Sequence, residues 1–293
     1  YCGLNFVISS ESMKLEFTAM MFFLCVLLPA VHAGGGPDID PERVARAYLD
    51  ARKAGLSFPE VFGNGEQHSD ALLYEVQRKL VELQLDEGLT IGGYKGGFIP
   101  KASIGGVLFA EGVLKGRPIL KRTDFQNLLV EAEIAFQFCA AIKLPVADVA
   151  ALKALTCNVY PAIELPDAAV RNLDGLLRDL PQLRRALIPT NMAVANVLLG
   201  EGKNPNSLDL DHLTIRATHN DVEIGNRDGS TSNDDIWSRV LWIVNEFVLA
   251  RGYELSAEHI IIPGALTGLH QSTPGHYKVD YGALGEVEFR IEP

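Results

Sequence analysis

Two glutamates stand one residue apart in an otherwise apolar stretch of the chain. The stretch is LVEAEIAF, residues 129–136, and the acids are Glu131 and Glu133. A buried carboxylate is costly unless a cation or a hydrogen-bond donor pairs with it. In a strand the two carboxylates would share one face, roughly 6–7 Å apart at their Cα atoms. In a helix they would diverge by about 200°. The spacing therefore favours a strand whose two acids hold one divalent cation.

A third acid and a lysine complete the candidate site. Glu164 stands alone in YPAIELPD, another apolar, strand-like stretch. Hard cations such as Mg²⁺ and Mn²⁺ prefer oxygen ligands and keep positions open for water and substrate. Lys95 lies between glycines in GGYKGGFIP, where a bare backbone allows a ligand to approach closely. The residues alone leave a second interpretation open, because strands with a solvated face are common and most lysines are exposed.

The surrounding sequence predicts an α+β chain. Capping residues and apolar stripes predict helices over 40–55, from Ser69 to Leu83, near 145–154 and over 234–252. Alternation of apolar and polar residues predicts a hairpin over 213–225 that turns at 219–221, and two or three strands in the C-terminal tail. Strands predominate without a regular βαβ alternation. The pattern therefore indicates a mixed or antiparallel sheet with flanking helices.

Composition and the N-terminal segment suggest where the protein acts. The 293 residues are long enough for one large domain or two small ones, and the net charge of −11 gives no electrostatic footprint for nucleic acid or an anionic membrane. From Met13 the chain reads as a secretory signal peptide, with small residues at Val31 and Ala33 before the expected cleavage. An uncleaved anchor is the alternative. We therefore expect upstream residues and a signal over 1–33, one domain over 34–293, and an exported, periplasmic or secreted protein.

Two cysteines remain in the expected mature chain, Cys139 and Cys157. An exported chain allows a disulfide between them. Their surroundings, FQFCAA and ALTCNVY, both resemble core sequence, so the favoured interpretation is two buried thiols that behave as small hydrophobic side chains.

Taken in order, these segments resemble the 2-keto-4-pentenoate hydratases of the fumarylacetoacetate hydrolase superfamily. GYKGGF is similar to the lysine-bearing segment of that family, VEAEIAF to its E-x-E strand, and YPAIELPD to the segment with its third acid. Three later segments are also similar: IPTNMAVANVLLG, IIIPGALTGLHQSTPG and YGALGEVEFRI. The resemblance spans nearly the whole expected mature chain.

The resemblance implies a mixed β-roll or sandwich with flanking helices, and a lyase site. One Mg²⁺ or Mn²⁺ would be bound by Glu131, Glu133 and Glu164. Lys95 would be catalytic, and the substrate contacts would be Lys95, Asn191 and Thr267. The substrate would be a small 2-oxo or 2-hydroxydienoic acid, as in aromatic catabolism, and water would add to it through a metal-stabilised enolate. The protein would be a homo-oligomer without stable membrane association after cleavage.

Two departures from the family pattern leave the reaction open. Thr190 stands where the family has an Asp before Asn191. After Glu164, the third acid, this chain has LPDAAV where many relatives carry Asp-Ser-Arg. One site can host several reactions. The alternatives are therefore a decarboxylase or C–C hydrolase on the same scaffold, or an exported protein that binds an oxo acid without turnover.

Overall fold

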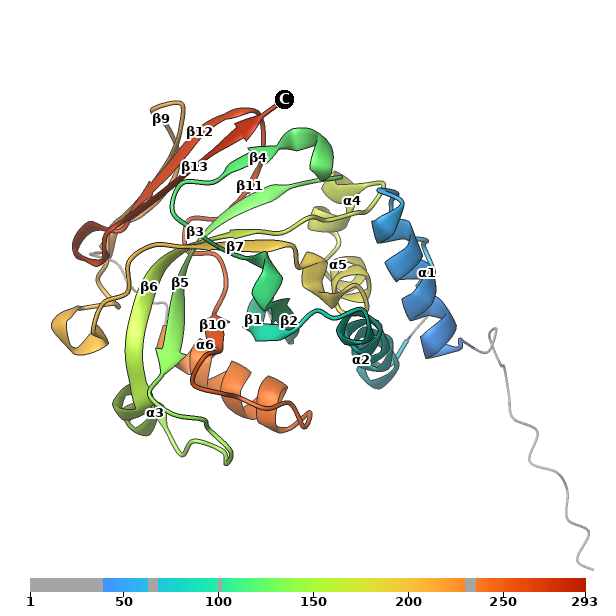
Figure 1. The fold of residues 1–293 in the computed structure, drawn as a ribbon, viewed down its shortest axis with the longest axis horizontal. Coiled ribbons are helices and arrows are strands. Elements are labelled where there is room, and N and C mark those ends of the chain that lie inside the picture. The colour runs from blue at the N-terminus through green and yellow to red at the C-terminus, as the bar shows by residue number, and fades with distance from the viewer. Residues whose placement is uncertain (1–38, 63–67, 100–101, 230–235) are drawn as a thin grey trace, which may run out of the picture. The chain divides into compact units, whose positions relative to one another are not determined.

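The computed structural model describes residues 39–62, 68–99, 102–229 and 236–293, all within one compact unit, Ile39–Pro293. Two sheets with helices on their flanks make up this unit, which confirms the predicted α+β class with a mixed sheet (Figure 1). The expected signal segment over 1–33 and the start at Met13 lie outside the described residues. Among the described helices, none combines the length and apolar character needed to span a bilayer.

The larger sheet carries the candidate site. Its strands run in the order β2-β1-β10-β5-β6-β7-β3, with β11 also paired to β5. Their bounds are β1 Ile91–Ile99, β2 Ala102–Phe109, β3 Val113–Lys115, β5 Leu129–Phe138, β6 Thr156–Leu165, β7 Asn196–Leu199, β10 Ile260–Ile262 and β11 Leu269–Gln271. The sheet is mixed because β1 pairs β10 in parallel and β2 antiparallel.

The smaller sheet has five strands in the order β4-β13-β12-β8-β9. Their bounds are β4 Ile119–Lys121, β8 Ile215–His219, β9 Val222–Arg227, β12 Gly275–Asp280 and β13 Glu286–Glu292. The predicted hairpin is confirmed as β8–β9, whose turn places Asn220 and Asp221 at φ 48° and 66°. Asn and Asp tolerate this left-handed region better than most residues do.

Helices gather on two sides of the sheets (Figure 1). Their bounds are α1 Pro41–Lys53, α2 Asp70–Asp86, α3 Val149–Leu155, α4 Leu173–Arg178, α5 Leu180–Leu187 and α6 Ile236–Trp242, which continues as the π-helical segment η6 Ile243–Leu249. The predicted starts of the first two helices are confirmed. Asp40 accepts a hydrogen bond from the Glu42 N–H at 3.0 Å, and Ser69 accepts one from the Leu72 N–H at 3.3 Å.

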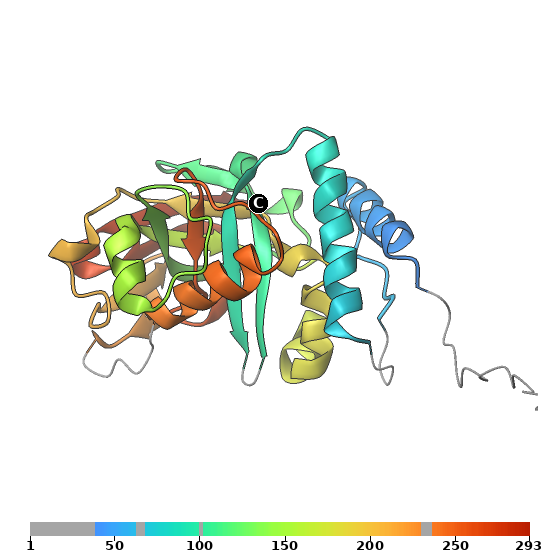
Figure 2. The ribbon, with the colours of Figure 1, turned by 90° about the horizontal axis from the view of Figure 1, so that it is seen from below.

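The β1–β2 hairpin, which carries Lys95, lies between α2 and the α6–η6 segment (Figures 1 and 2). Its glycines let the helical segment pack closely. A methyl group on Gly105 would come within 2.3 Å of the Phe247 ring, and one on Gly96 within 2.7 Å of Ile243. The glycines beside Lys95 therefore serve helix packing as well as any approach by a ligand.

Buried hydrogen bonds tie α2 to this hairpin. The Gln77 side-chain amide donates to the carbonyl oxygens of Gly105 at 3.0 Å and Ile188 at 2.8 Å, and the Tyr74 hydroxyl accepts from the Gly105 N–H at 3.1 Å. Because an unpaired buried amide is costly, these contacts fix α2 to both β2 and the end of α5.

The β5–β6 strand pair places the candidate acids in register. Glu131 lies directly opposite Glu164 across the antiparallel ladder. Two residues along the ladder, Glu133 lies opposite Ala162. The Tyr281 hydroxyl donates to the Ala162 carbonyl and accepts from the Glu133 N–H at 3.2 Å. A tyrosine that follows β12 thus helps to hold both acid-bearing strands in place.

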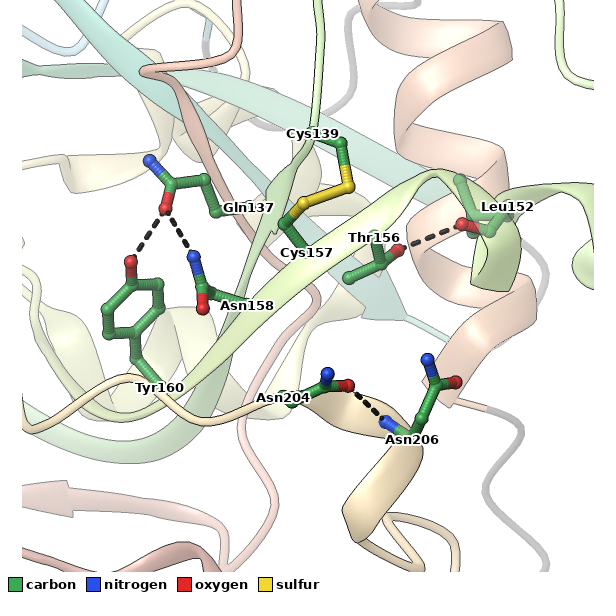
Figure 3. The surroundings of a disulfide bond; sticks show 9 residues. All are labelled: Gln137, Cys139, Leu152, Thr156, Cys157, Asn158, Tyr160, Asn204 and Asn206. Carbon is green, nitrogen blue, oxygen red and sulfur yellow. Dashed lines mark hydrogen bonds between the residues drawn. A yellow bond between two sulfur atoms is a disulfide. The ribbon is translucent and has the colours of Figure 1, made fainter.

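The far end of the same strand pair is closed by a disulfide between Cys139 and Cys157 (Figure 3). Both cysteines are exposed, so the favoured sequence interpretation of two buried, unpaired thiols is wrong. The ladder register shifts between Gln137 and Phe138, and the chain leaves the core there. Phe136, Phe138 and Val159 belong to the core, whereas the cysteines, with Ala140 and Leu155, lie past its edge.

Candidate metal centre

Three carboxylates converge on one point of the larger sheet. Glu131 and Glu133 lie on one face of β5, and Glu164 reaches the same point from β6. One oxygen from each carboxylate lies within 4.8 Å of the others. Glu133 and Glu164 are buried, whereas Glu131 is partly exposed. The predicted strand therefore does bring the pair together, and the third acid joins them from a neighbouring strand.

Lys95 of β1 faces the same cluster. Its side chain is buried and forms an ion pair with Glu164, and its ammonium donates to the Met192 carbonyl at 3.2 Å. Burial disfavours the charged ammonium, but the negative charges of Glu164, Glu131 and Glu133 outweigh it and raise the pKa of Lys95. Lys95 is therefore a fixed positive charge at neutral pH.

The charges around this point do not balance. Three carboxylates face one lysine, which leaves two negative charges in excess when all are ionised. Burial first, and then repulsion by Glu164, raises the pKa of Glu131 to about 7, although Lys95 opposes the shift. Burial and the neighbouring acids also raise the pKa of Glu133 well above its usual range. Such shifts identify a cluster that holds a proton unless a cation takes its place.

The donor set fits a hard divalent cation. Glu133 Oε2 accepts a hydrogen bond from the Gly264 N–H at 2.7 Å, which orients that carboxylate. Glu133 Oε1 and Glu164 Oε2 are buried and have no hydrogen-bond partner among the described residues. Oxygen-only ligands at this spacing suit Mg²⁺, Mn²⁺ or Ca²⁺, and a bound ion would satisfy both orphaned oxygens.

A cavity of about 280 Å³ opens beside the carboxylates. Its charged lining residues are Lys95, Glu131, Glu164 and Arg239. Arg239, on α6, lies with its guanidinium carbon 5.2 Å from the centre of the Phe98 ring. The sequence pattern did not predict Arg239 as a site residue. The available signal was a single cation among apolar residues early in the strongest predicted helix.

Two predicted substrate contacts, Asn191 and Thr267, lie outside the cavity lining. The Asn191 amide donates to the Val107 carbonyl and accepts from the Val107 N–H, each at 2.8 Å. The Thr267 hydroxyl oxygen is buried and has no hydrogen-bond partner among the described residues. For both residues, a direct contact with substrate stays a prediction.

The two departures from the family pattern have structural partners. The Thr190 hydroxyl donates to the Ala186 carbonyl at 2.7 Å and so closes the end of α5. The Asp167 carboxylate, in the LPDAAV segment, accepts from the backbone N–H groups of Gln126 at 3.0 Å and Asn127 at 2.7 Å. Neither Thr190 nor Asp167 lines the cavity, whereas Pro166 and Ala168 of the LPDAAV segment do.

Comparisons with known proteins agree with this architecture. No family model matches the chain. A 2-oxo-hept-4-ene-1,7-dioate hydratase from Escherichia coli is 28% identical over 258 residues, covering 82% of this chain and 91% of the relative.

Solved structures share the fold. A 4-oxalocrotonate decarboxylase from Pseudomonas putida G7, complexed with magnesium and adipate, superimposes with a TM-score of 0.76 at 19% identity over 86% of this chain and 97% of that one. A 2-hydroxyhepta-2,4-diene-1,7-dioate isomerase from Mycobacterium marinum gives a TM-score of 0.51 at 13% identity, covering 69% and 76%. The chain is therefore similar in sequence to a hydratase and shares the fold of the decarboxylase and isomerase structures, in agreement with the resemblance to the 2-keto-4-pentenoate hydratases that its motifs indicated.

Proposed function

We propose that the protein is a divalent-metal-dependent hydro-lyase that adds water to a small 2-oxo or 2-hydroxydienoic acid. The observation that carries the proposal is the set of three carboxylate oxygens within 4.8 Å of one another, beside a cavity. Mg²⁺ or Mn²⁺ is the proposed ion, since both take oxygen ligands and leave positions open for a ligand. The similarity to a hydratase favours hydration over the other reactions of the group.

Lys95 provides the chain's own contribution to the chemistry. When bound, a divalent cation supplies a Lewis acid that stabilises negative charge on the substrate's 2-oxygen. The Lys95 ammonium adds a second positive charge at the same end of the cavity, and burial strengthens its interaction with a developing oxyanion. Its ion pair with Glu164 and its bond to the Met192 carbonyl hold it in place before substrate arrives.

Hydration is balanced without an oxidant or a reductant. A 2-hydroxydienoate first becomes its conjugated 2-oxo-3-enoate tautomer, with a proton moved from the 2-hydroxyl to the terminal carbon. Water then gives its hydroxyl to C4 and a proton to C3, forming a 4-hydroxy-2-oxo acid. Each step gathers or releases negative charge at the 2-oxygen, which is where Lys95 acts.

The test is an assay of purified protein with Mg²⁺ and 2-hydroxypenta-2,4-dienoate, following loss of the dienol absorbance. We expect a product heavier than the substrate by one water. Release of CO₂ from 4-oxalocrotonate instead would assign the decarboxylase alternative. Mg²⁺-dependent binding of oxalate without any turnover would assign the binding-protein alternative.

A Lys95→Met variant sharpens the assay. The change removes the positive charge and keeps an unbranched side chain, so we expect kcat to fall about 10²–10³-fold, the usual cost of losing one oxyanion-stabilising group. Mg²⁺ binding should persist, because Lys95 competes with the cation for Glu164. A Lys79→Met variant, on the α2 surface, is the control and should leave kcat unchanged.

We further propose that the protein is exported. The signal pattern after Met13 supports this, as does the exposed disulfide, since disulfides persist in oxidising compartments. N-terminal sequencing of protein recovered outside the cytoplasm should begin at or near Gly34. A sequence beginning at Met13 would contradict cleavage.

A further inference from the structure

The cavity beside the metal centre is lined by two chemically different sets of residues. Its charged lining residues are Lys95, Glu131, Glu164 and Arg239, and its remaining wall is largely apolar. That apolar wall includes the leucines Leu129, Leu173, Leu177, Leu183, Leu187 and Leu269. They come from β5, α4, α5 and β11, so separate elements supply the same type of side chain to one surface.

Much of this leucine wall is uncovered. Leu177 and Leu183 are half-buried although they line the cavity. Leu129, Ala168 and Ala193 form a small apolar cluster of their own, apart from the main core, against which Leu173 packs. An apolar ligand segment laid on this wall would remove apolar surface from water, at about 25 cal/mol per Å².

Both lining cations lie close to the carboxylates. Lys95 belongs to the metal centre, and a methyl group built on Gly264 would lie 3.8 Å from Arg239 Nη1. Gly264 is also the residue that donates to Glu133, so Arg239 stands beside the metal end of the cavity. Lys95 and Arg239 are therefore placed to contact the oxo-acid head of a ligand rather than its tail.

Two further basic side chains lie in a pocket that shares leucines with the cavity. Arg122 and Arg171 line a neighbouring pocket, and Leu129 and Leu173 line both that pocket and the cavity. The Arg122 guanidinium also donates to the Phe125 carbonyl at 2.8 Å. A carboxylate placed on the leucine wall would lose water without gaining a cation among the described lining residues.

We propose that this site selects a monocarboxylic 2-oxo acid with an apolar tail over a dicarboxylic one. The proposal rests on the proposed function, because the metal centre must hold the oxo-acid head for the tail to reach the leucines. It separates this chain from the relatives, whose names or bound ligands are dicarboxylates: a heptenedioate for the hydratase and adipate for the decarboxylase structure.

The test measures binding rather than turnover. Calorimetry in saturating Mg²⁺ would compare saturated 2-oxo acids, which contain no carbon–carbon double bond for the enzyme to hydrate. The ligands are 2-oxobutanoate, 2-oxopentanoate, 2-oxohexanoate, 2-oxoheptanoate and 2-oxoheptanedioate. Each added methylene should tighten binding by about fourfold, the equivalent of about 0.8 kcal/mol per buried methylene. The dioate should bind at least tenfold more weakly than 2-oxoheptanoate. Equal or tighter binding of the dioate would overturn the proposal.

A pair of leucine variants makes the test local. Leu177→Arg places a cation in the wall and should reverse the preference between 2-oxoheptanoate and the dioate. Leu180→Arg makes the same change at a position 40% exposed and outside the cavity lining, and should leave the preference unchanged. Reversal by both variants would point to general electrostatics and against the wall. If Leu177→Arg does not fold, Leu177→Asn should flatten the methylene series, and an unflattened series would count against the proposal.

The outcomes also separate this inference from the proposed function. Preference for the dioate with normal hydration would overturn the inference alone. The predicted methylene series without hydration of any dienoate would overturn the hydratase assignment alone. Failure of every 2-oxo acid to bind in Mg²⁺ would overturn both.

Discussion

The β5–β6 strand pair ends in two opposite ways. At one end the paired residues are Glu131 and Glu164, two like charges directly across the ladder, joined there by the buried Glu133. At the other end Cys139 and Cys157 form a covalent bond at the surface. One ladder thus carries a carboxylate cluster that is unfavourable without a ligand and a disulfide that needs no ligand.

This difference shows which end is available for function. A disulfide stabilises chiefly by restricting the unfolded chain, so the cysteine end needs no ligand. Carboxylates in register repel one another and lose solvation, so the glutamate end needs a cation, a proton or both. The antiparallel register that makes the cluster unfavourable is what prepares it to bind an ion.

The largest expected effect comes from removing one acid. Glu133→Ala should eliminate Mg²⁺ binding at millimolar concentration, because losing a direct ligand exceeds the roughly 10–100-fold cost of losing an outer partner. Calorimetry measures the Mg²⁺ binding, and Glu286→Ala, at the exposed first residue of β13, is the matched control. Unchanged Mg²⁺ affinity in Glu133→Ala would remove the distinction between the two ends.

The next effect lies at the other end. Replacing Cys139 and Cys157 together by Ser should lower the free energy of unfolding by about 3 kcal/mol, from the chain-entropy relation for a loop of this length. The sequence separation that the bond closes is 18 residues. Urea titration measures the loss, and Mg²⁺ affinity should stay the same. A weakened Mg²⁺ site would show that the two ends are coupled.

The pH dependence of the metal-free protein tests the glutamate end more finely. The folded pKa of Glu131 is about 7, raised from an ordinary 4.5, so its folded state holds the proton more tightly. Its contribution to stability is present below about pH 4.5 and is lost as the pH rises toward 7. As the pH rises from 5 to 8, the free energy of unfolding of Glu131→Gln should therefore increase by on the order of 2 kcal/mol relative to that of the wild type.

The control for this prediction is the ion itself. With saturating Mg²⁺ at pH 8 the wild type should become the more stable of the two, because binding to the folded state alone adds stability. Parallel stability curves for both proteins across pH 5–8 without metal would contradict the raised pKa.

The smallest effect concerns a hydrogen bond near the disulfide (Figure 3). The Tyr160 hydroxyl donates to Gln137 Oε1 at 2.6 Å, and Asn158 donates to the same oxygen at 3.4 Å. Tyr160→Phe should cost about 1 kcal/mol of stability and leave Mg²⁺ binding unchanged. A cost as large as that of losing the disulfide would mean that this bond, rather than the covalent link, secures the cysteine end.

Local patterns in the sequence predicted the part of the site that lies along single strands. The period of two in LVEAEIAF correctly placed Glu131 and Glu133 on one face of a strand, and the caps Asp40 and Ser69 correctly marked two helices. Glu164 was predicted as a third ligand because it stands alone in an apolar stretch, and the resemblance supported it. That it lies directly opposite Glu131 is a matter of register between strands, which periodicity does not specify.

Other features depended on where the chain leaves the core. The apolar neighbours of Cys139 and Cys157 suggested burial, but the ladder shift near Gln137 puts both cysteines at the surface. The segment 173–187 forms two short helices, α4 and α5, which part at Asp179, with a Pro in the first turn of α5. The leucine wall of the cavity was therefore not predicted.

The hydrogen bonds of Gln77 bear on how the protein can be shortened. Its single amide joins α2 to the hairpin that carries Lys95 and to the end of the leucine-bearing α5. A truncation that begins after α2, designed to isolate a minimal catalytic fragment, would leave the carbonyls of Gly105 and Ile188 without their donor. Helix α2 is thus part of the smallest unit worth expressing, and deletion libraries should begin no later than its N-cap, Ser69.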